Sequence, residues 1–315
     1  MGTEGALVGG RYRLDQPIGR GRAGIVWLAF DTLLHRTVAA KKMAVAPGHS
    51  EQSITTALDE GRAAMAIQHN CAIAVYDVFR DGPEPWLVME YVPSRNMADF
   101  LAEYGTLTPD QTAFLGIQLA SALAAAHRAG VVHRGLEPGN VLLADDGGVK
   151  ITDIGFTGAG FNPAYRAPEL SHGASAAPAT DAFSLGATLY TAVEGVPPYG
   201  DHGGGALREP VKAGVLAPAL MKLLREDPLS RPTLADSITS FQAITQGRQT
   251  AFIPPTAPAL PTVPAFRPQQ PPPPPPPKEP LVRLSPTRVR QLILAAMAVF
   301  VAAAIGIGVS QLLFL

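Results

Sequence analysis

The stretch HRGLEPGNVLL, residues His133 to Leu143, decides how the rest of the chain is interpreted. The Ala- and Leu-rich segment Pro109–Gly130 precedes it and is typical of a helix that ends at its glycine. Val149–Thr152 follows it and is typical of a short strand, with Asp153–Gly155 directly after. We therefore expect a polar loop between a helix and a strand, with Asn and Asp side chains close to where the strand ends.

Two further motifs lie earlier in the chain, in the same order along the sequence. Gly19–Val26 reads GRGRAGIV and joins two expected strands, where glycines let a backbone lie close over phosphates. A GxGxxG pattern alone also fits a tight hairpin turn, and its place between two strands argues against a strand-to-helix dinucleotide turn. Thr37–Lys41 is expected to form a strand that ends in a lysine.

Together these motifs resemble the Hanks-type protein kinases, and most closely the bacterial membrane-anchored Ser/Thr kinases. His133–Asn140 is similar to HRDLxxxN, Thr37–Lys41 to VAIK, Asp153–Gly155 to DFG and Ala167–Glu169 to APE. The resemblance covers about residues 11–245. It implies an α+β, bilobal kinase fold, with an antiparallel sheet and one helix in the small lobe and a mainly helical large lobe.

The resemblance also implies a nucleotide site. Glycines would cover the phosphates, Lys41 would reach the α- and β-phosphates, and Glu60 on an expected helix Ser53–Ile67 would pair with Lys41. The neighbouring Asp59 is the alternative partner. Met89 would be the gatekeeper, and two Mg²⁺ ions would be held by Asn140 and Asp153. The nucleotide-binding positions so implied are Gly19, Gly21, Gly24, Val26, Ala39, Lys41, Glu60, Met89, Glu90, Val92 and Leu142.

Within that set, the backbone groups of Glu90 and Val92 would meet an adenine edge, and Val26, Ala39 and Leu142 would sandwich the ring. Each of these residues alone would simply be a core residue. Two large-lobe positions are implied to be structural rather than ligand-binding. Asp181 would steady the catalytic loop, and Arg231 would pair with Glu169.

The catalytic loop itself, with His133, Arg134, Gly135 and Glu137, departs from the family pattern at two of these residues. Gly135 replaces the catalytic Asp, whose orienting and proton-accepting role is worth roughly 10²–10⁴-fold in rate. Glu137 replaces the usual Lys, so that repulsion replaces attraction near the phosphates. A displaced base at Glu137 is an alternative interpretation. The following segment holds one Thr, Thr157, and Asn162 stands where the family has a Thr.

Composition divides the chain into parts. We expect a tail at residues 1–10, a kinase-like domain at 11–247 and a Pro-rich linker at 248–290, disordered or extended, with a run of seven prolines. A transmembrane helix follows at 291–311 and a short tail at 312–315. Charged residues make up only 16% of the sequence, and the net charge of −1 indicates no nucleic-acid partner.

Basic residues precede the apolar segment, at Lys278, Arg283, Arg288 and Arg290, and none follows it. The positive-inside rule therefore predicts a single-pass protein of the cell membrane with its kinase-like domain in the cytoplasm. The lone cysteine, Cys71, excludes a disulfide framework and agrees with that compartment.

Three hypotheses of function follow. The first is a membrane-tethered regulatory or scaffold pseudokinase that binds ATP and Mg²⁺ and contacts protein partners of a signalling or cell-envelope pathway. A true kinase would phosphorylate linker residues Thr250, Thr256 and Thr262. The second is an active Ser/Thr kinase with an atypical mechanism. The third is transfer of another part of ATP. The sequence leaves the oligomeric state open.

Overall fold

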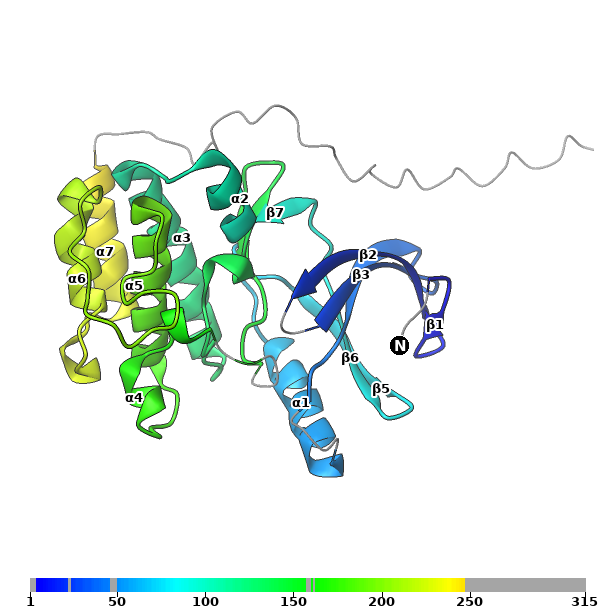
Figure 1. Ribbon diagram of the computed structural model, residues 1–315. Coiled ribbons are helices and arrows are strands. Elements are labelled where there is room, and N and C mark those ends of the chain that lie inside the picture. The colour runs from blue at the N-terminus through cyan, green and yellow to red at the C-terminus, as the bar shows by residue number, and fades with distance from the viewer. Residues whose placement is uncertain (1–3, 22–23, 46–49, 157–159, 161, 247–315) are drawn as a thin grey trace, which may run out of the picture. The chain divides into compact units, whose positions relative to one another are not determined.

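The computed structural model describes residues 4–21, 24–45, 50–156, 160 and 162–246 (Figure 1). These residues belong to one compact unit, Met1–Thr262. The expected linker and transmembrane helix, from residue 248 onward, lie outside them. Within the part of the chain that the structure describes, no helix is both long enough and apolar enough to span a bilayer.

The small lobe is built on an antiparallel sheet of six strands in the order β1-β2-β3-β4-β6-β5. Its apolar side chains fall into two buried clusters, one containing Leu14 and Val88 and the other Ala39 and Met89. The strands are β1 (Leu7–Val8), β2 (Tyr12–Gly21), β3 (Gly24–Asp31), β4 (Arg36–Lys42), β5 (Val75–Asp81) and β6 (Glu84–Met89).

Helix α1 (Glu51–Ala64) packs against β5 and β6. It begins two residues before the expected Ser53, because the Ser50 hydroxyl accepts a hydrogen bond from the Ser53 amide and caps the helix. Its buried residues recur at helical spacing. A Cβ on Gly61 would lie 2.9 Å from the Val78 methyl groups, so the glycine lets α1 approach the sheet closely.

The large lobe is mainly helical and is organised around α5 (Pro178–Glu194), which is buried on all sides from Thr180 to Val193. A helix surrounded in this way forms the centre of a core rather than a surface layer. The other helices are α2 (Met97–Tyr104), α3 (Pro109–Arg128), α4 (Pro168–Ser171), α6 (Ala217–Leu223) and α7 (Leu234–Thr245), with short 3₁₀ turns η1 (Pro138–Asn140), η2 (Pro163–Tyr165), η3 (Gly214–Leu216) and η4 (Pro228–Ser230).

The expected helix before the polar loop is confirmed in α3. A capping box between Thr108 and Gln111 starts it, and Gly130 follows its end with a left-handed φ of 77°. The loop then leads into a second sheet of β7 (Ser94–Asn96), β8 (Val141–Ala144) and β9 (Val149–Ile151). The expected bilobal fold, with one sheet-based and one helical lobe, is thus the observed one.

Candidate functional site

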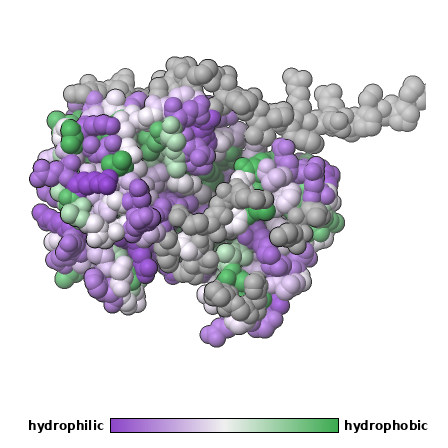
Figure 2. Space-filling view, viewed as in Figure 1, coloured by the Kyte–Doolittle hydropathy of each residue, from purple (hydrophilic) through white to green (hydrophobic). Residues whose placement is uncertain are grey.

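Apolar residues from both lobes meet in one cluster at the centre of the candidate site. Ala39 and Met89 are buried in it, and Val26, Val92 and Leu142 pack against it. The register of the strands explains this meeting, because Ala39 pairs with Met89 and Val26 pairs with Lys41 across neighbouring strands. The structure therefore brings together the residues expected to sandwich a flat ring. On the face drawn in Figure 2, polar side chains cover most of each lobe and apolar patches show beside the recess between them.

The glycine-rich stretch forms the ends of β2 and β3, which are joined by residues 22–23. Gly21 and Gly24 are register partners, and Gly24 has a φ of 110° that disfavours any side chain. A Cβ there would lie 3.3 Å from the carbonyl oxygen of Lys42. The stretch is therefore a hairpin, as expected for a loop between two strands.

At the end of β6, the backbone N–H of Glu90 donates to the carbonyl oxygen of Ala74 at 2.8 Å. The Glu90 carboxylate accepts hydrogen bonds from the Lys150 ammonium, at 3.0 Å, and from the Ala74 amide. This side chain therefore ties the end of the small-lobe sheet to β9 of the large lobe. Contact between the Glu90 and Val92 backbones and an adenine ring stays a prediction.

The ammonium of Lys41 and the carboxylate of Asp153 form an ion pair at 2.7 Å between the lobes. The two side chains are 8% and 15% exposed, so water screens the pair only in part. Asp153 holds its place with a left-handed φ of 63°, which Asp tolerates better than most residues. Lys41 thus lies at the expected position and binds the residue expected to hold a metal.

Glu60, the expected partner of Lys41, binds Arg134 in the structure. The guanidinium Nη1 of Arg134 lies 2.9 Å from a Glu60 carboxylate oxygen and 3.2 Å from the carbonyl oxygen of Gly155. Arg134 therefore joins α1 of the small lobe to the catalytic loop and to the segment after Asp153. Nothing in the sequence pattern indicates this contact. A Lys41–Glu60 ion pair stays a prediction.

The catalytic loop is held by its backbone. The buried carboxylate of Asp181 accepts hydrogen bonds from the amides of His133 and Arg134, both at 2.8 Å. Arg134 has a left-handed φ of 73° there, a conformation that such anchoring maintains. Asp181 also binds the Nε2 atom of His127 at 2.7 Å. Sequence reasoning missed His127, because a histidine in an Ala- and Leu-rich helix carries no signal of its own.

Around position 135 the loop keeps its shape without the missing side chain. The Asn140 amide nitrogen donates to the Gly135 carbonyl oxygen at 3.1 Å, and the Asn140 backbone N–H donates to the Glu137 carbonyl oxygen at 2.9 Å. The Thr188 hydroxyl binds the Leu136 carbonyl oxygen. The Asn140 amide nitrogen is thus used by the loop, which leaves its side-chain oxygen as the atom suited to a metal.

Asn162 stands where the family has a Thr in the activation segment, and its side chain stabilises the local 3₁₀ turn. Its side-chain oxygen accepts a hydrogen bond from the Ala164 amide and caps η2. Thr157 lies outside the described residues.

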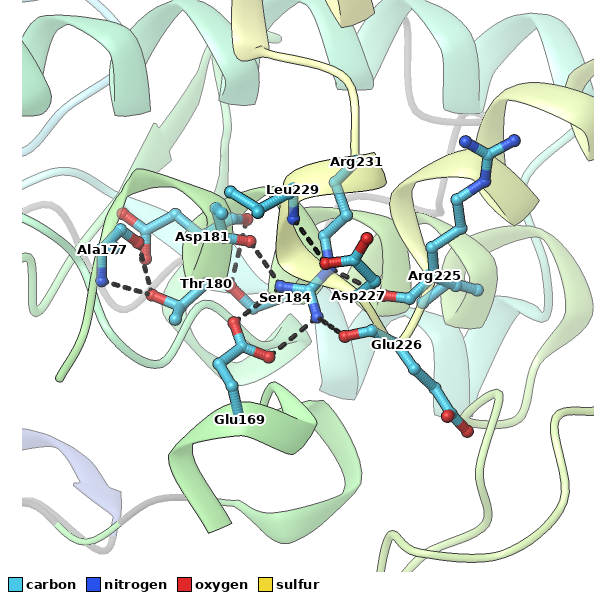
Figure 3. Close-up of polar contacts among 12 residues, drawn as sticks. Glu169, Ala177, Thr180, Asp181, Ser184, Arg225, Glu226, Asp227, Leu229 and Arg231 are labelled. Atoms are coloured by element: carbon cyan, nitrogen blue, oxygen red, sulfur yellow. Dashed lines mark hydrogen bonds and ion pairs between the residues drawn. The ribbon is translucent and has the colours of Figure 1, made fainter. Parts of the chain in front are cut away.

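Figure 3 shows the ion pair expected between Arg231 and Glu169. Two guanidinium nitrogens lie 2.7 and 2.8 Å from the two carboxylate oxygens. The remaining N–H groups of Arg231 donate to three backbone carbonyl oxygens, so all five donors are used. Burial is the largest effect on the pKa of Glu169 and raises it, but the hydrogen bonds and charge of Arg231, together with a backbone hydrogen bond, lower the pKa to below its ordinary value. This structural pair is confirmed.

A small pocket lies behind Met89, between α1, β6 and Asp153. It is lined mainly by apolar side chains, among them Ala64, Leu87 and Phe156. Among the described residues, no group of three or more His, Cys, Asp or Glu side chains gathers as a metal site would require. The Thr152 amide, next to Asp153 in the chain, donates a hydrogen bond to the Asn140 carbonyl oxygen and so links the two residues expected to hold Mg²⁺. Metal binding by Asn140 and Asp153 stays a prediction.

These features of fold and site define a protein kinase domain. A family model described as "Protein kinase domain" matches residues 12–241, and the chain belongs to that family. The resemblance to Hanks-type kinases is therefore confirmed.

Its relatives include bacterial Ser/Thr kinases. Serine/threonine-protein kinase PknL of Mycobacterium tuberculosis is 34% identical over 208 residues, which is 62% of this chain and 52% of the relative. Serine/threonine-protein kinase PkaA of Streptomyces coelicolor is 33% identical over 285 residues, which is 76% of this chain and 51% of the relative. The chain thus spans about half the length of these curated relatives.

A solved structure shows the same fold. The PknI kinase domain of Mycobacterium tuberculosis superposes with a TM-score of 0.68 at 23% identity, covering 77% of this chain and 98% of that domain.

Proposed function

We propose that this chain is a membrane-anchored pseudokinase that binds ATP and Mg²⁺ and is impaired in phosphoryl transfer. One observation carries the proposal. The catalytic loop is anchored by Asp181 and Asn140, yet residue 135 at its centre has no side chain. The parts that would hold a nucleotide persist, while the part that would act on a substrate hydroxyl is missing.

Two features support nucleotide binding. Val26, Ala39 and Leu142 form an apolar surface suited to a flat ring, and the Lys41 ammonium offers a positive charge for phosphate. The Lys41 ammonium is nearly buried and already faces a carboxylate, so phosphate oxygens offer it a second anionic partner. The backbone of the glycine-rich hairpin has the freedom to lie over the phosphates.

Two oxygen donors fit Mg²⁺, one from the Asn140 amide and one from the Asp153 carboxylate. A bound Mg²⁺ ion supplies positive charge to the phosphate oxygens in this family. Asn140 is oriented for this role because its nitrogen is occupied by the Gly135 carbonyl oxygen. Asp153 offers one oxygen to Lys41 and has a second for a metal.

Phosphoryl transfer is impaired at two positions. Gly135 offers no carboxylate to orient a substrate hydroxyl or accept its proton. Glu137 places a negative charge where the family has a positive one, and two unit charges 4 Å apart interact by about 4 kcal/mol at an effective dielectric of 20. The Glu137 side chain lies near Gly139, beside Asn140, which supports an effect on the phosphate region.

The apolar segment at 291–311 and the basic residues before it support anchoring in the cell membrane with the kinase domain in the cytoplasm. In that position the domain acts by contact with protein partners of a signalling or cell-envelope pathway. Phosphate on Thr250, Thr256 and Thr262, added by an active kinase, recruits such a partner. The test replaces the three threonines by Ala and measures how much partner protein is recovered from cross-linked membranes. Undiminished recovery would reject the role of phosphorylation in recruiting a partner.

The test uses the full-length chain purified in detergent. ATP with Mg²⁺ is expected to raise the midpoint of thermal unfolding, because a ligand of the native state stabilises it. Lys41→Met is expected to remove the shift, and Arg62→Gln, which alters an exposed pair on α1, is expected to keep it. No shift in the wild-type chain would exclude nucleotide binding.

The second candidate is an active kinase with an atypical mechanism, because positioning and electrostatics supply most of the catalysis in phosphoryl transfer. Incubation with labelled ATP separates the two candidates. Incorporation of label that Lys41→Met abolishes would establish the active kinase and reject the pseudokinase. Covalent attachment of a different part of labelled ATP to the protein would instead establish transfer of that group.

A further inference from the structure

Three exposed valines of the large lobe lie in segments that one side chain holds together. Val196, Val211 and Val215 are 42%, 88% and 67% exposed. The carboxylate of Glu194, two residues before Val196, accepts hydrogen bonds from two successive amides, the first that of Lys212, at 2.8 and 2.9 Å. The Lys212 ammonium donates in turn to the Glu194 carbonyl oxygen at 3.2 Å. These three apolar side chains in neighbouring segments are called the valine patch below.

The valine patch borders the place where the chain leaves the described domain. Val215 lies on η3, and η3 contacts both α3 and α7, which is the last helix of the described residues. Helix α7 has 12 residues and is therefore about 18 Å long, so its end at Thr245 lies within about 18 Å of that contact. Phe252 follows Thr245 by seven residues, which can extend over about 25 Å. The segment directly after the domain is thus long enough to reach Val215.

That segment, Ala251–Leu260, reads AFIPPTAPAL and lies outside the described residues. It offers large apolar side chains, among them Phe252 and Leu260, and positions 249–266 hold no charged residue. Apolar surface can therefore cover the segment without taking a charge out of water. Its prolines favour an extended chain before any contact forms, which lowers the entropy lost on docking. The chemistry of the segment thus matches that of the valine patch.

We propose that Ala251–Leu260 docks on the valine patch of its own domain. The inference goes beyond the proposed function and does not depend on nucleotide binding. Removing the apolar surface of Val211 and Val215 from water, together with that of the segment, drives the contact. Because patch and segment belong to one chain, the contact forms at the high effective concentration that a short tether provides.

Docking has a consequence for Thr256, which lies in the middle of the segment. A phosphate on its hydroxyl carries nearly two negative charges, and docking would move those charges onto an apolar surface close to the Glu194 carboxylate. Phosphorylation of Thr256 therefore opposes docking. The docked segment in turn keeps Thr256 away from a kinase or a partner until it is released.

The experiment measures how fast chymotrypsin cuts after Phe252 in the full-length chain, reconstituted in nanodiscs of neutral lipid. The rate follows the population of undocked segment when docking is fast relative to cleavage. Val211→Lys with Val215→Lys is expected to speed the cut about tenfold, because losing two apolar anchors of a contact changes its population by about this factor.

Leu229→Lys is the matched control, since this side chain lies on η4 of the same lobe and is 93% exposed (Figure 3). It is expected to leave the cleavage rate unchanged. The thermal unfolding midpoints of both lysine variants are expected to equal that of the wild type, because the replaced side chains are exposed. A faster cut therefore reports the segment and not the stability of the domain.

Leu260→Ser tests the same contact from the side of the segment. It is expected to speed the cut as well, and to add nothing in the Val211→Lys, Val215→Lys background, because both changes remove one contact. A wild-type rate in the valine variant, or additive effects, would overturn the inference. A rate that falls as protein concentration rises would assign the valine patch to a second copy of the chain and would overturn it too. ATP·Mg²⁺ binding is measured separately by thermal shift, so failure of the proposed function leaves this result unaffected.

Discussion

Gly135 has no side chain, yet its backbone adopts a conformation that other residues can also adopt. Its φ lies outside the left-handed region, unlike that of Gly130 or Gly155, so the backbone conformation does not require glycine there. The carbonyl oxygen of Gly135 is bound by Asn140, and that bond does not depend on the side chain of residue 135. The hydrogen bonding of the loop is therefore independent of the side chain at position 135.

Restoring the two family residues is expected to restore transfer. Gly135→Asp with Glu137→Lys should raise autophosphorylation by roughly 10²-fold or more over the wild-type chain, since proton handling and charge support return together. Each single variant should gain less. Labelled ATP and the full-length protein measure the outcome, and Lys41→Met added to the double variant is the control. A double variant as inactive as the wild type would show that further parts are missing.

The second residue-scale prediction concerns Arg231, whose side chain is fully buried. Arg231→Ala leaves the Glu169 carboxylate without its bidentate partner, and removing one member of a buried pair costs roughly 3–5 kcal/mol. Denaturant unfolding measures the loss. Arg225→Ala, which removes a single exposed donor to the Ser230 carbonyl oxygen, is the matched control, with an expected cost of about 1 kcal/mol or less. Equal losses would contradict the buried-pair account.

At the scale of the elements, the end of β3 carries a buried carboxylate with several hydrogen-bond donors around it. The buried Asp31 carboxylate accepts two hydrogen bonds from the Arg11 guanidinium, both at 2.7 Å, and two from the amides of Leu33 and Leu34. Arg11 is the largest cause that lowers the pKa of Asp31, to about 2. One carboxylate thus joins Arg11, the residue before β2, to the turn between β3 and β4.

This arrangement predicts an acid-sensitive small lobe. Because the folded-state pKa lies below the usual 3.8, the stabilisation is present above about pH 4 and is lost as pH falls toward 2. Asp31→Asn should cost about 2 kcal/mol at neutral pH and flatten the pH dependence of unfolding in that window. Asp15→Asn, in a more exposed pair with Arg13, should cost under about 1 kcal/mol. An unchanged acid limb in Asp31→Asn would refute this assignment.

The order of the motifs along the chain was enough to predict the helices and strands that carry the site. Some of the contacts between these elements could not be predicted from the sequence. The β2–β3 hairpin, β4, α3 and the Arg231–Glu169 pair were expected from the sequence. The partner of Glu60 was not, because it depends on how α1 is rotated against the large lobe. The His127–Asp181 bond was missed for a similar reason, since 54 residues separate its partners. Helix ends shifted by two or three residues because caps such as Ser50 decide them.

At the scale of the whole molecule, the prediction of membrane anchoring depends on the apolar segment at residues 291–311 and not on the kinase domain. We expect the full-length chain to remain in washed membranes. Ala303→Lys with Ile305→Lys should release it, because each lysine at the centre of a span costs roughly 2.5–3.5 kcal/mol on an insertion scale. Ala303→Leu is the control and should keep the chain in the membrane. A full-length chain washed off by high salt would contradict anchoring by a span.

The anchoring of the catalytic loop by Asp181 has a consequence for how such proteins change over time. Asp181 binds the amides of His133 and Arg134, and every residue except proline carries that donor. These two anchoring bonds therefore do not depend on the side chain at position 135. A substitution there, in either direction between Asp and Gly, leaves both bonds in place. If the proposed function holds, forms of this fold that differ in catalysis are separated by substitutions that keep the loop anchored.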